Sequence, residues 1–336
     1  MADQLRWGVL GTGFISGTLA EAITQSESGS VVAVGSRSED KAREFGERFG
    51  ATRFYDSYEG VINDPEIDIV YNGLPNHLHA PLSILCARAG KHILCEKPVA
   101  MNHDEAVAVI ETIKEHDVFF MEAFMYRTHP QMAEMVELIR DGAIGQVRLI
   151  ESSFGFNRDM TGDCRMNPEW GGGGIMDVGC YVVSGSRLAA GAALGTDFAE
   201  PTSVNGIGFV DPETQVDLWA SAALQFDGGI QASLACGMQV ETEWRLCVFG
   251  SEGYIRINTP WLPHMDNHRF VVKRSGSESE EEIPCDKSKT VFLHEIETVA
   301  KHIADRQVPP PCMSWDDTLG NMKVLDEWRR QVGVRV

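Results

Sequence analysis

Residues 1–140 alternate between short apolar runs and longer segments whose apolar residues recur at helical spacing. Residues 7–10, 31–34 and 118–121 are apolar runs of strand length, which are typical of strands buried on both faces of a sheet. Residues 41–49 and 104–115 carry apolar positions three and four apart, and this spacing predicts helices. Strands that alternate with helices predict an α/β domain with a doubly wound parallel sheet.

The second half of the chain has a different pattern of short alternating stretches. Turn signals such as Phe226-Asp227-Gly228-Gly229 separate them, which predicts mostly antiparallel strands and an α+β domain with a largely antiparallel open sheet. The predicted strands are residues 147–156, 216–224, 229–236, 243–249 and 253–258, and amphipathic helices at residues 292–303 and 318–331 close the chain. We expect domains at residues 1–125 and 126–336, with closing helices that can pack back on the first domain.

Composition narrows the class of protein. A chain of 336 residues is long enough for two domains, and a net charge of −20 argues against nucleic-acid or anionic-membrane partners. Eight cysteines without C-x-x-C spacing suit reduced thiols. The first six residues are too short and too polar for a signal peptide, and no apolar stretch is long enough to cross a membrane. We expect a cytoplasmic protein.

A glycine-rich turn follows the first predicted strand. It reads Gly11-Thr12-Gly13-Phe14-Ile15-Ser16, the G-x-G-x-x-G pattern with serine at the third position, and a helical pattern comes next. Gly11 permits the tight turn, and Gly13 lets backbone N–H groups approach a pyrophosphate at the helix N-terminus. An ordinary turn is the alternative, but its place after the first strand favours dinucleotide binding in a Rossmann domain.

The residues after the second predicted strand indicate which dinucleotide is bound. NAD-specific sites place an acid there for the ribose 2′-hydroxyl, but this chain reads Gly35-Ser36-Arg37-Ser38. A hydroxyl and a guanidinium suit a 2′-phosphate, so the segment favours NADP over NAD. A solvated turn before the next helix is the alternative.

Two other predicted strands carry polar residues to their carboxyl ends. Glu96 and Lys97 end one of them, where a lysine can act as a fixed charge or, partly desolvated, as a group with a lowered pKa. The alternative is a lysine that extends into solvent. Residues 74–79 follow another strand, and we interpret His77 and His79 as turn residues near a cofactor, since no third metal ligand has a recognisable spacing. No metal is expected.

Four glycines, residues 171–174, precede Asp177 and Tyr181. Such a run indicates close approach of the backbone to another group. If a helix begins here, Asp177 and Tyr181 share one face, and with a lysine they form a plausible proton-transfer trio. The alternative is an aspartate near a helix N-terminus and a tyrosine packed in the core, and the helix alone does not separate the two.

Four features in this order resemble the glucose–fructose oxidoreductase, inositol dehydrogenase and rhizopine-catabolism (Gfo/Idh/MocA) family. They are the glycine loop, Pro75-Asn76 with His79, Glu96-Lys97-Pro98, and the second glycine run with Asp177 and Tyr181. The resemblance covers essentially the whole chain. It implies hydride transfer between a nicotinamide ring and a carbon of a sugar, anhydro-sugar or diol. It also implies a homodimer, or a higher homo-oligomer, formed through the open sheet.

The resemblance also implies roles for individual residues. Lys97 matches the family's lysine that orients the substrate oxygen, and Asp177 matches the aspartate that hydrogen-bonds the substrate. Tyr181 stands where many members have histidine, which is similar to the branch of dimeric dihydrodiol dehydrogenase and the NADP-linked xylose dehydrogenases. The expected catalytic residues are Lys97, Asp177 and Tyr181; the expected cofactor-binding residues are Gly11, Gly13, Phe14, Ile15, Ser36, Arg37, Pro75, Asn76, His79, Glu96, Lys97 and Arg165; the expected substrate-binding residues are Lys97, Asp177, Tyr181 and Phe156.

Three alternatives stay open at this point. The substrate can be a trans-dihydrodiol rather than a sugar. Some proteins of this fold cleave glycosides with tightly held NAD, which the missing acid after the second strand disfavours. Others only sense the dinucleotide, which the intact lysine, aspartate and tyrosine disfavour.

Overall fold

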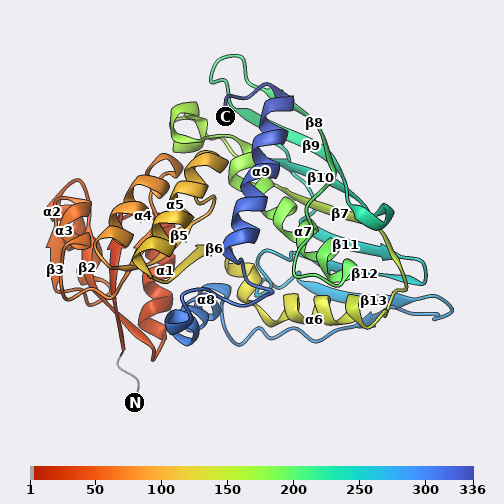
Figure 1. Ribbon diagram of the computed structural model, residues 1–336, viewed down its shortest axis with the longest axis horizontal. Helices are drawn as coiled ribbons and strands as arrows, with labels where there is room; N and C mark the ends of the chain where they lie inside the picture. The colour runs from red at the N-terminus through yellow and green to blue at the C-terminus, as the bar shows by residue number, and fades with distance from the viewer. Residues whose placement is uncertain (1–3) are drawn as a thin grey trace. The chain divides into compact units, whose positions relative to one another are not determined.

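The computed structural model describes residues 4–336, which form two compact units, each with its own sheet (Figure 1). The first unit consists of residues 4–125 and 289–318, and the second of residues 126–288 and 319–336. Helix α8 (Val291–His302) therefore belongs to the first unit, whereas most of α9 (Trp315–Val332) belongs to the second.

The first unit is built on six parallel strands in the order β3-β2-β1-β4-β5-β6, and the prediction of a parallel sheet is confirmed. The strands are β1 (Leu5–Leu10), β2 (Gly29–Gly35), β3 (Arg53–Tyr55), β4 (Ile69–Asn72), β5 (His92–Glu96) and β6 (Phe120–Ala123). The order reverses at β1, which pairs with β2 on one side and β4 on the other. Ligands of such sheets bind beyond the carboxyl ends of the strands near this reversal.

Helices cover this sheet because its central strands are apolar on both faces. Helices α4 and α5 contact each other, and α1 contacts α8 (Figure 1). Ile296 and Val299 of α8 share a core with Trp7 and Leu19. The helices are α1 (Phe14–Gln25), α2 (Glu39–Glu47), α3 (Tyr58–Ile62), α4 (His79–Arg88) and α5 (His103–His116).

The second unit contains an eight-stranded sheet in the order β14-β13-β12-β11-β7-β10-β9-β8. The strands are β7 (Val147–Gly155), β8 (Ser203–Val210), β9 (Asp217–Gln225), β10 (Gln231–Gly237), β11 (Arg245–Gly250), β12 (Gly253–Asn258), β13 (Arg269–Arg274) and β14 (Glu281–Glu282). Neighbours pair antiparallel except β7 and β10, which are parallel. The prediction of a largely antiparallel sheet is confirmed.

Strand β8 was absent from the sequence prediction, and its packing explains why. Gly206 and Gly208 occupy positions where a Cβ would collide with Trp328 and Val332 of α9. Glycine is needed because the helix lies directly on the strand. The apolar alternation that reveals a strand is therefore missing from the sequence.

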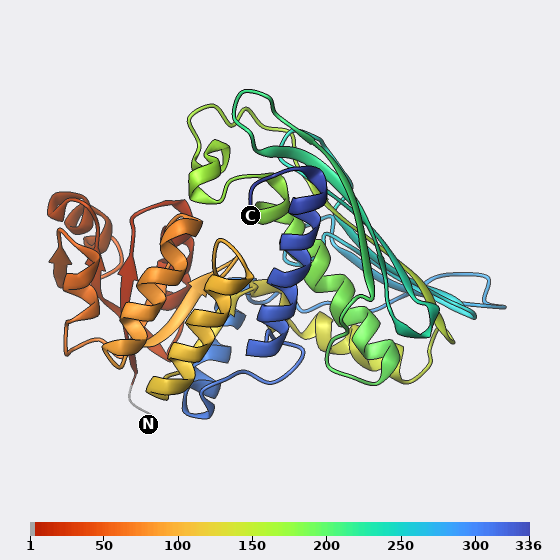
Figure 2. The same ribbon diagram turned by 45° about the horizontal axis from the view of Figure 1, so that its top comes forward.

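Helices cover one face of this second sheet, as Figure 2 shows for α7 (Cys180–Leu194) and α9; α6 (Pro130–Arg140) completes the helices of this unit. Along β8 and β9, the other face exposes Ile207, Phe209 and Trp219, and the last two rings stack with centroids 4.5 Å apart. Among the helices of residues 4–336, none combines the length and the apolar character needed to span a membrane.

Candidate active site

The glycine loop connects β1 to α1 in the first unit. Gly11 has φ +90° and its N–H donates to the Gly35 oxygen at 2.9 Å, while a Cβ there would lie 2.8 Å from Leu74 Cδ2. Gly13 is the N-cap of α1, and a Cβ there would have no neighbour within 4 Å. Gly11 is thus required by the turn itself, whereas Gly13 leaves open space next to the first N–H groups of the helix.

The third position of this motif is Ser16, whose side chain is fully buried. A Cβ on Gly73, just after β4, would lie 2.8 Å from Ser16 Oγ. The helix therefore packs close to the sheet with serine in place of the usual glycine, because its opposite neighbour is a glycine.

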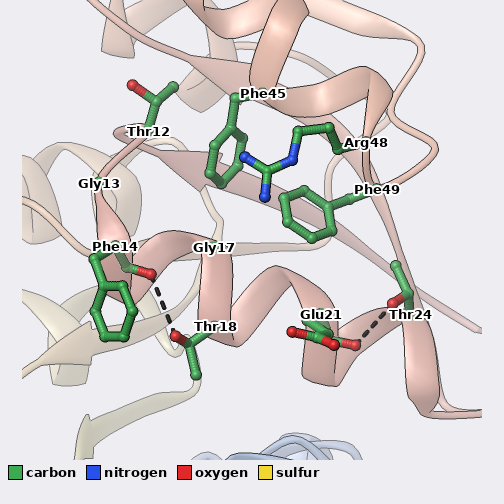
Figure 3. A pocket seen from close by; sticks show the side chains of 10 residues that line it. All are labelled: Thr12, Gly13, Phe14, Gly17, Thr18, Glu21, Thr24, Phe45, Arg48 and Phe49. Atoms are coloured by element: carbon green, nitrogen blue, oxygen red, sulfur yellow. Dashed lines mark hydrogen bonds between the residues drawn. The ribbon is translucent and has the colours of Figure 1, made fainter.

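A groove of about 610 Å³ opens beside this loop (Figure 3). Thr12, Gly13 and Phe14 line one side, and α2 and the residues just after it contribute a cluster of rings with an arginine. The guanidinium of Arg48 lies 5.1 Å from the ring centroid of Phe49 and 6.0 Å from that of Phe45, and Phe14 is 91% exposed.

The segment after β2 contains the two residues expected at the ribose. Ser36 is buried, and its N–H donates to the Tyr55 oxygen at 3.1 Å. Arg37 is exposed, and Ser38 caps α2 by accepting from the Lys41 N–H. This places a solvent-accessible guanidinium at the carboxyl end of β2, where NAD-specific proteins place an acid.

Lys97 follows directly after β5 and is half-buried. The peptide bond between Lys97 and Pro98 is cis. The Nδ1 atom of His79 lies 2.7 Å from the Pro98 oxygen, and its Nε2 atom lies 2.6 Å from the Leu74 oxygen. Burial lowers the pKa of His79 to about 4, against the effect of the two carbonyl groups, and the ring joins the turns that follow β4 and β5.

A second buried side chain holds this segment from the neighbouring strand. Glu122 of β6 accepts from the Val99 N–H at 3.0 Å and from the Thr318 hydroxyl at 2.7 Å. Burial raises the pKa of Glu122 to about 7, against the effect of these two donors and of Lys97. Lys97 is thus flanked by fixed backbone on its carboxyl side.

Glu96, the last residue of β5, is also buried. It accepts from the Tyr71 hydroxyl at 2.7 Å, and burial raises the pKa of Tyr71 well above its ordinary value, so the phenol keeps its proton. Glu295 of α8 is fully buried in the same unit, and burial, together with the Glu96 charge, raises its pKa well above the ordinary range. Burial therefore favours the protonated form of Glu295.

The candidate residues of the second unit lie around the second glycine run. Asp177 belongs to a five-residue π-helical turn, Ile175–Gly179, that leads directly into α7. Such turns are rare and occur often at functional sites. Arg165 Nε lies 2.9 Å from Asp177 Oδ2, and the backbone and side-chain N–H groups of Arg165 also donate to Asp163. The Asp177 carboxylate raises the pKa of Arg165, which stays charged between the two aspartates.

Tyr181 lies in the first turn of α7 and is 4% exposed. Its ring contacts those of Phe154, Tyr126 and Trp261, with centroids 5.2, 5.7 and 5.7 Å away. Ser184, one turn further along α7, hydrogen-bonds the Tyr126 hydroxyl at 2.8 Å and accepts from the buried Arg127. Aromatic packing of this kind fixes the orientation of the Tyr181 ring.

Within each unit, the structure brings together part of the expected site. Lys97 follows Glu96 at the end of β5, where His79 of α4 contacts the Pro98 oxygen, and Asp177 pairs with Arg165. Phe156, by contrast, packs with Met160, Val216, Leu218 and Met238, and the residue of β7 that touches Tyr181 is Phe154. Sequence reasoning singled out neither the packing role of Phe154 nor the holding role of Glu122. The role of Glu122 could have been suspected from one feature of the sequence, an acidic residue at the end of an apolar run.

Across residues 4–336, no group of three or more histidine, cysteine or acidic side chains has an arrangement that could hold a metal ion. All eight cysteines are free thiols.

Two family models match the chain. Residues 5–124 match the model described as "Oxidoreductase family, NAD-binding Rossmann fold", and residues 132–256 match the "GFO/IDH/MocA C-terminal domain". The two matches coincide with the parallel sheet of the first unit and with much of the antiparallel sheet of the second.

Curated relatives and solved structures agree with this match. The chain is 31% identical to trans-1,2-dihydrobenzene-1,2-diol dehydrogenase of Xenopus tropicalis over 98% of both chains. It is 36% identical to D-xylose 1-dehydrogenase (NADP(+)) 2 of Haloferax volcanii over 68% of both. A 3-ketoreductase of Actinomadura kijaniata, solved in complex with NADP and TDP-benzene, superposes with a TM-score of 0.86 at 26% identity over 98% of both chains.

Proposed function

The chain belongs to the Gfo/Idh/MocA family of oxidoreductases, and from this premise we propose that it transfers hydride between NADP and a carbon of a sugar, anhydro-sugar or diol. The observation that carries the proposal is Lys97, a half-buried lysine at the carboxyl end of β5 with fixed backbone after it. A positive charge in that place can hold the oxygen on which charge develops during hydride transfer.

The proposed chemistry uses three side chains. Lys97 and Asp177 orient a substrate hydroxyl, and Tyr181 takes its proton when the alcohol is oxidised. In the reverse direction, Tyr181 returns this proton to the carbonyl oxygen. A phenol has a pKa near 10, and an adjacent ammonium group lowers it enough for this task. When bound, the nicotinamide ring accepts or supplies the hydride.

The preference for NADP is supported by Ser36 and Arg37. A guanidinium at the end of β2 matches a 2′-phosphate in charge and geometry, and no acid stands in that segment to bind a free 2′-hydroxyl. The open space beside Gly13 is compatible with a pyrophosphate at the N-terminus of α1. The remaining proposed contacts of the dinucleotide are Gly11, Phe14, Ile15, Pro75, Asn76, His79, Glu96, Lys97 and Arg165.

The proposed substrate class is supported by the relatives. One is named for a dihydrodiol, one for D-xylose, and the similar solved structure is a 3-ketoreductase. Their common feature is an alcohol carbon with polar neighbours. We propose Phe156 and the aromatic residues around Tyr181 as part of the surface that receives it.

We also propose a homodimer formed through the open face of the second sheet, in the cytoplasm. Stacked Phe209 and Trp219 and the 74% exposed Ile207 make this face more apolar than a solvated sheet needs to be. Six of the eight cysteines are buried thiols, which suits a reducing compartment. Light scattering of Trp219→Arg tests the dimer: the variant should be a monomer, and an unchanged mass contradicts this interface.

The function is tested by titrating the protein with NADPH and NADH and then screening aldoses, anhydro-sugars and diols by the absorbance of the reduced nicotinamide. We expect tighter binding of NADPH and turnover of at least one member of the panel. Arg37→Ala should weaken NADPH binding about tenfold or more and leave NADH unchanged, since only NADPH carries the 2′-phosphate. Arg43→Ala, at an exposed arginine on α2 paired with Glu39, is the matched control.

Two results would contradict the proposal. A preference for NADH that Arg37→Ala does not alter would overturn the assignment of NADP. Tight dinucleotide binding without a redox change on any member of the panel would favour a glycoside-cleaving enzyme or a dinucleotide sensor.

A further inference from the structure

A buried aspartate lies under the second glycine run. Asp217 is the first residue of β9 and is 0% exposed. Its Oδ2 atom accepts from the Ile175 N–H at 2.7 Å, and the Gly174 N–H also donates to this carboxyl group. These N–H groups begin the π-helical turn that contains Asp177, so Asp217 caps the helix that carries both Asp177 and Tyr181.

The same carboxyl group explains why glycines are needed here. Gly173 has φ +113°, and a Cβ on it would collide with Asp217 Oδ1. A Cβ on Gly174 would lie 3.4 Å from Asp217 Oδ2 and 3.2 Å from the Cα of Gly237. A Cβ on Gly172 would collide with the Arg165 oxygen. The backbone at Gly173 and Gly174 therefore passes so close to the buried carboxyl group that a side chain would not fit between them.

Asp177 is tied to this cap through short links. The Asp177 N–H donates to the Gly173 oxygen at 3.0 Å, and the Gly173 N–H donates to the Arg165 oxygen at 2.9 Å. The Arg165 side chain then pairs with Asp177 at 2.9 Å. A displacement of the backbone at Gly173 thus moves both the main chain and the side-chain partner of Asp177.

We propose that Asp217 is a positioning residue for the reaction, because its carboxyl group fixes the backbone from which Asp177 and Tyr181 project. This inference rests on the proposed function, in which these two residues act on the substrate. All of the contacts that support it lie within the second unit, where Arg165 is the one proposed contact of the dinucleotide.

The surroundings of Asp217 fit this role. Burial raises the pKa of Asp217 to about 7, and the charge of Arg329 on α9 acts in the opposite direction, as do the N–H donors from Ile175 and Gly174. Cys236 on β10 also interacts with this carboxyl group, and burial raises the pKa of its thiol well above the ordinary range. The N–H groups that donate to Asp217 belong to the start of the π-helical turn, so the carboxyl group and the turn hold each other in place.

The test compares Asp217→Ala with Asp217→Asn. Alanine removes the acceptor, and we expect a loss of kcat on the order of a hundredfold, since small displacements of reacting groups have effects of this size. The dissociation constant of NADPH should change much less than kcat, because Arg165 is the one proposed dinucleotide contact in this unit. Asparagine keeps one oxygen for the Ile175 N–H, so it should restore most of kcat. Asp227→Ala, at an exposed aspartate in the turn after the opposite end of β9, is the matched control and should leave kcat unchanged.

Hydrogen exchange gives a readout that does not depend on activity. In Asp217→Ala, the amides of residues 174–178 should exchange faster, whereas they should stay protected in Asp217→Asn and Asp227→Ala. Native protection together with full turnover in Asp217→Ala would overturn the positioning role and leave the proposed function untouched. Full turnover in Tyr181→Phe would overturn the proposed function, and hydrogen exchange would still report the cap.

Gly173→Ala gives a second variant that keeps the test decisive if Asp217→Ala does not fold. The new methyl group displaces the same carboxyl group without removing it, so a similar loss of kcat is expected. In the Asp217→Ala background, where it folds, the alanine should have a smaller effect, because only the backbone strain remains. An equal effect of Gly173→Ala in both backgrounds, or full turnover of Gly173→Ala alone, would contradict the proposal.

Discussion

The segments that carry the proposed catalytic residues of the two units are each held by a buried carboxyl group, but in different ways. In the first unit, Glu122 accepts from the Val99 N–H, 23 residues away and just after the neighbouring parallel strand. In the second, Asp217 accepts from the Ile175 N–H, 42 residues away. The first contact needs no glycine, whereas the second lies under a backbone that has no room for side chains at residues 172–174.

This difference shows two ways of fixing a catalytic segment. A parallel sheet places the ends of neighbouring strands side by side. An acid on one strand can therefore reach the turn that follows the neighbouring strand, and no glycine is needed for this contact. The first turn of a helix that packs against a strand distant in sequence needs a buried acceptor for its N–H groups, and glycines where its backbone passes close to that acceptor. We expect the first arrangement to tolerate substitution better than the second.

The largest effect is expected when one catalytic residue is removed from each segment. Lys97→Met and Asp177→Asn should each lower kcat/KM by roughly two to four orders of magnitude, because each removes a group that orients the reacting oxygen. If both act on one substrate, the double variant should be little worse than the poorer single variant, since residues that act as a unit are strongly non-additive. Steady-state kinetics measure this. If the loss of kcat/KM in the double variant equals the product of the two single losses, the two residues act independently, which would contradict their action as a unit.

A smaller effect concerns the stability of the segment held by Glu122. The pKa of this carboxyl group is raised from 4.5 to about 7 by burial, so the folded state keeps the proton while the unfolded state loses it. Stability therefore falls as pH rises through this window, by about 3 kcal/mol for this group alone. Glu122→Gln stays neutral, so its free energy of unfolding relative to the wild type should rise by up to this amount between pH 4.5 and 7.

Urea denaturation of both proteins at several pH values makes the measurement. Glu111→Gln, at an exposed glutamate on α5, is the control, and its difference from the wild type should not vary with pH. A difference between Glu122→Gln and the wild type that is equally constant would contradict the assignment.

The smallest effect separates the glycines of the two units. A methyl group at Gly13 meets no protein atom within 4 Å, so Gly13→Ala should change the free energy of unfolding by only about 0.5 kcal/mol and weaken NADPH binding about tenfold. Gly11→Ala should destabilise by about 1–3 kcal/mol, because φ is +90° and Leu74 is close. Thermal unfolding with and without NADPH distinguishes them, and a Gly13→Ala protein that NADPH stabilises as much as it does the wild type would contradict a ligand role for Gly13.

Much of the fold follows from local patterns in the sequence. The apolar runs of the first unit identify parallel strands, and the residues that end them, such as Glu96 and Lys97, then fall at one edge of the sheet. The parallel character of the first sheet and the largely antiparallel character of the second are confirmed. These features depend on neighbours in the sequence or on rules that hold for every sheet of the class.

Other features depend on contacts between distant residues, which a single sequence does not reveal. The glycines of β8 are explained only by α9, which lies more than 100 residues later, and Gly173 of the second glycine run only by Asp217. The π-helical turn at residues 175–179 has no sequence signature that distinguishes it from an α-helix. The aromatic contacts of Tyr181 involve Phe154 rather than Phe156, because β7 ends at Gly155 and its alternation does not continue.

The central claim is that Tyr181 exchanges the proton of the substrate during hydride transfer. Its most direct test is the turnover of Tyr181→Phe on the substrate found in the panel, measured together with the dissociation constant of NADPH. We predict a loss of roughly two to four orders of magnitude in kcat with unchanged NADPH affinity, since only the hydroxyl group is removed from a ring that keeps its packing. A Tyr181→Phe protein with wild-type turnover would contradict the claim.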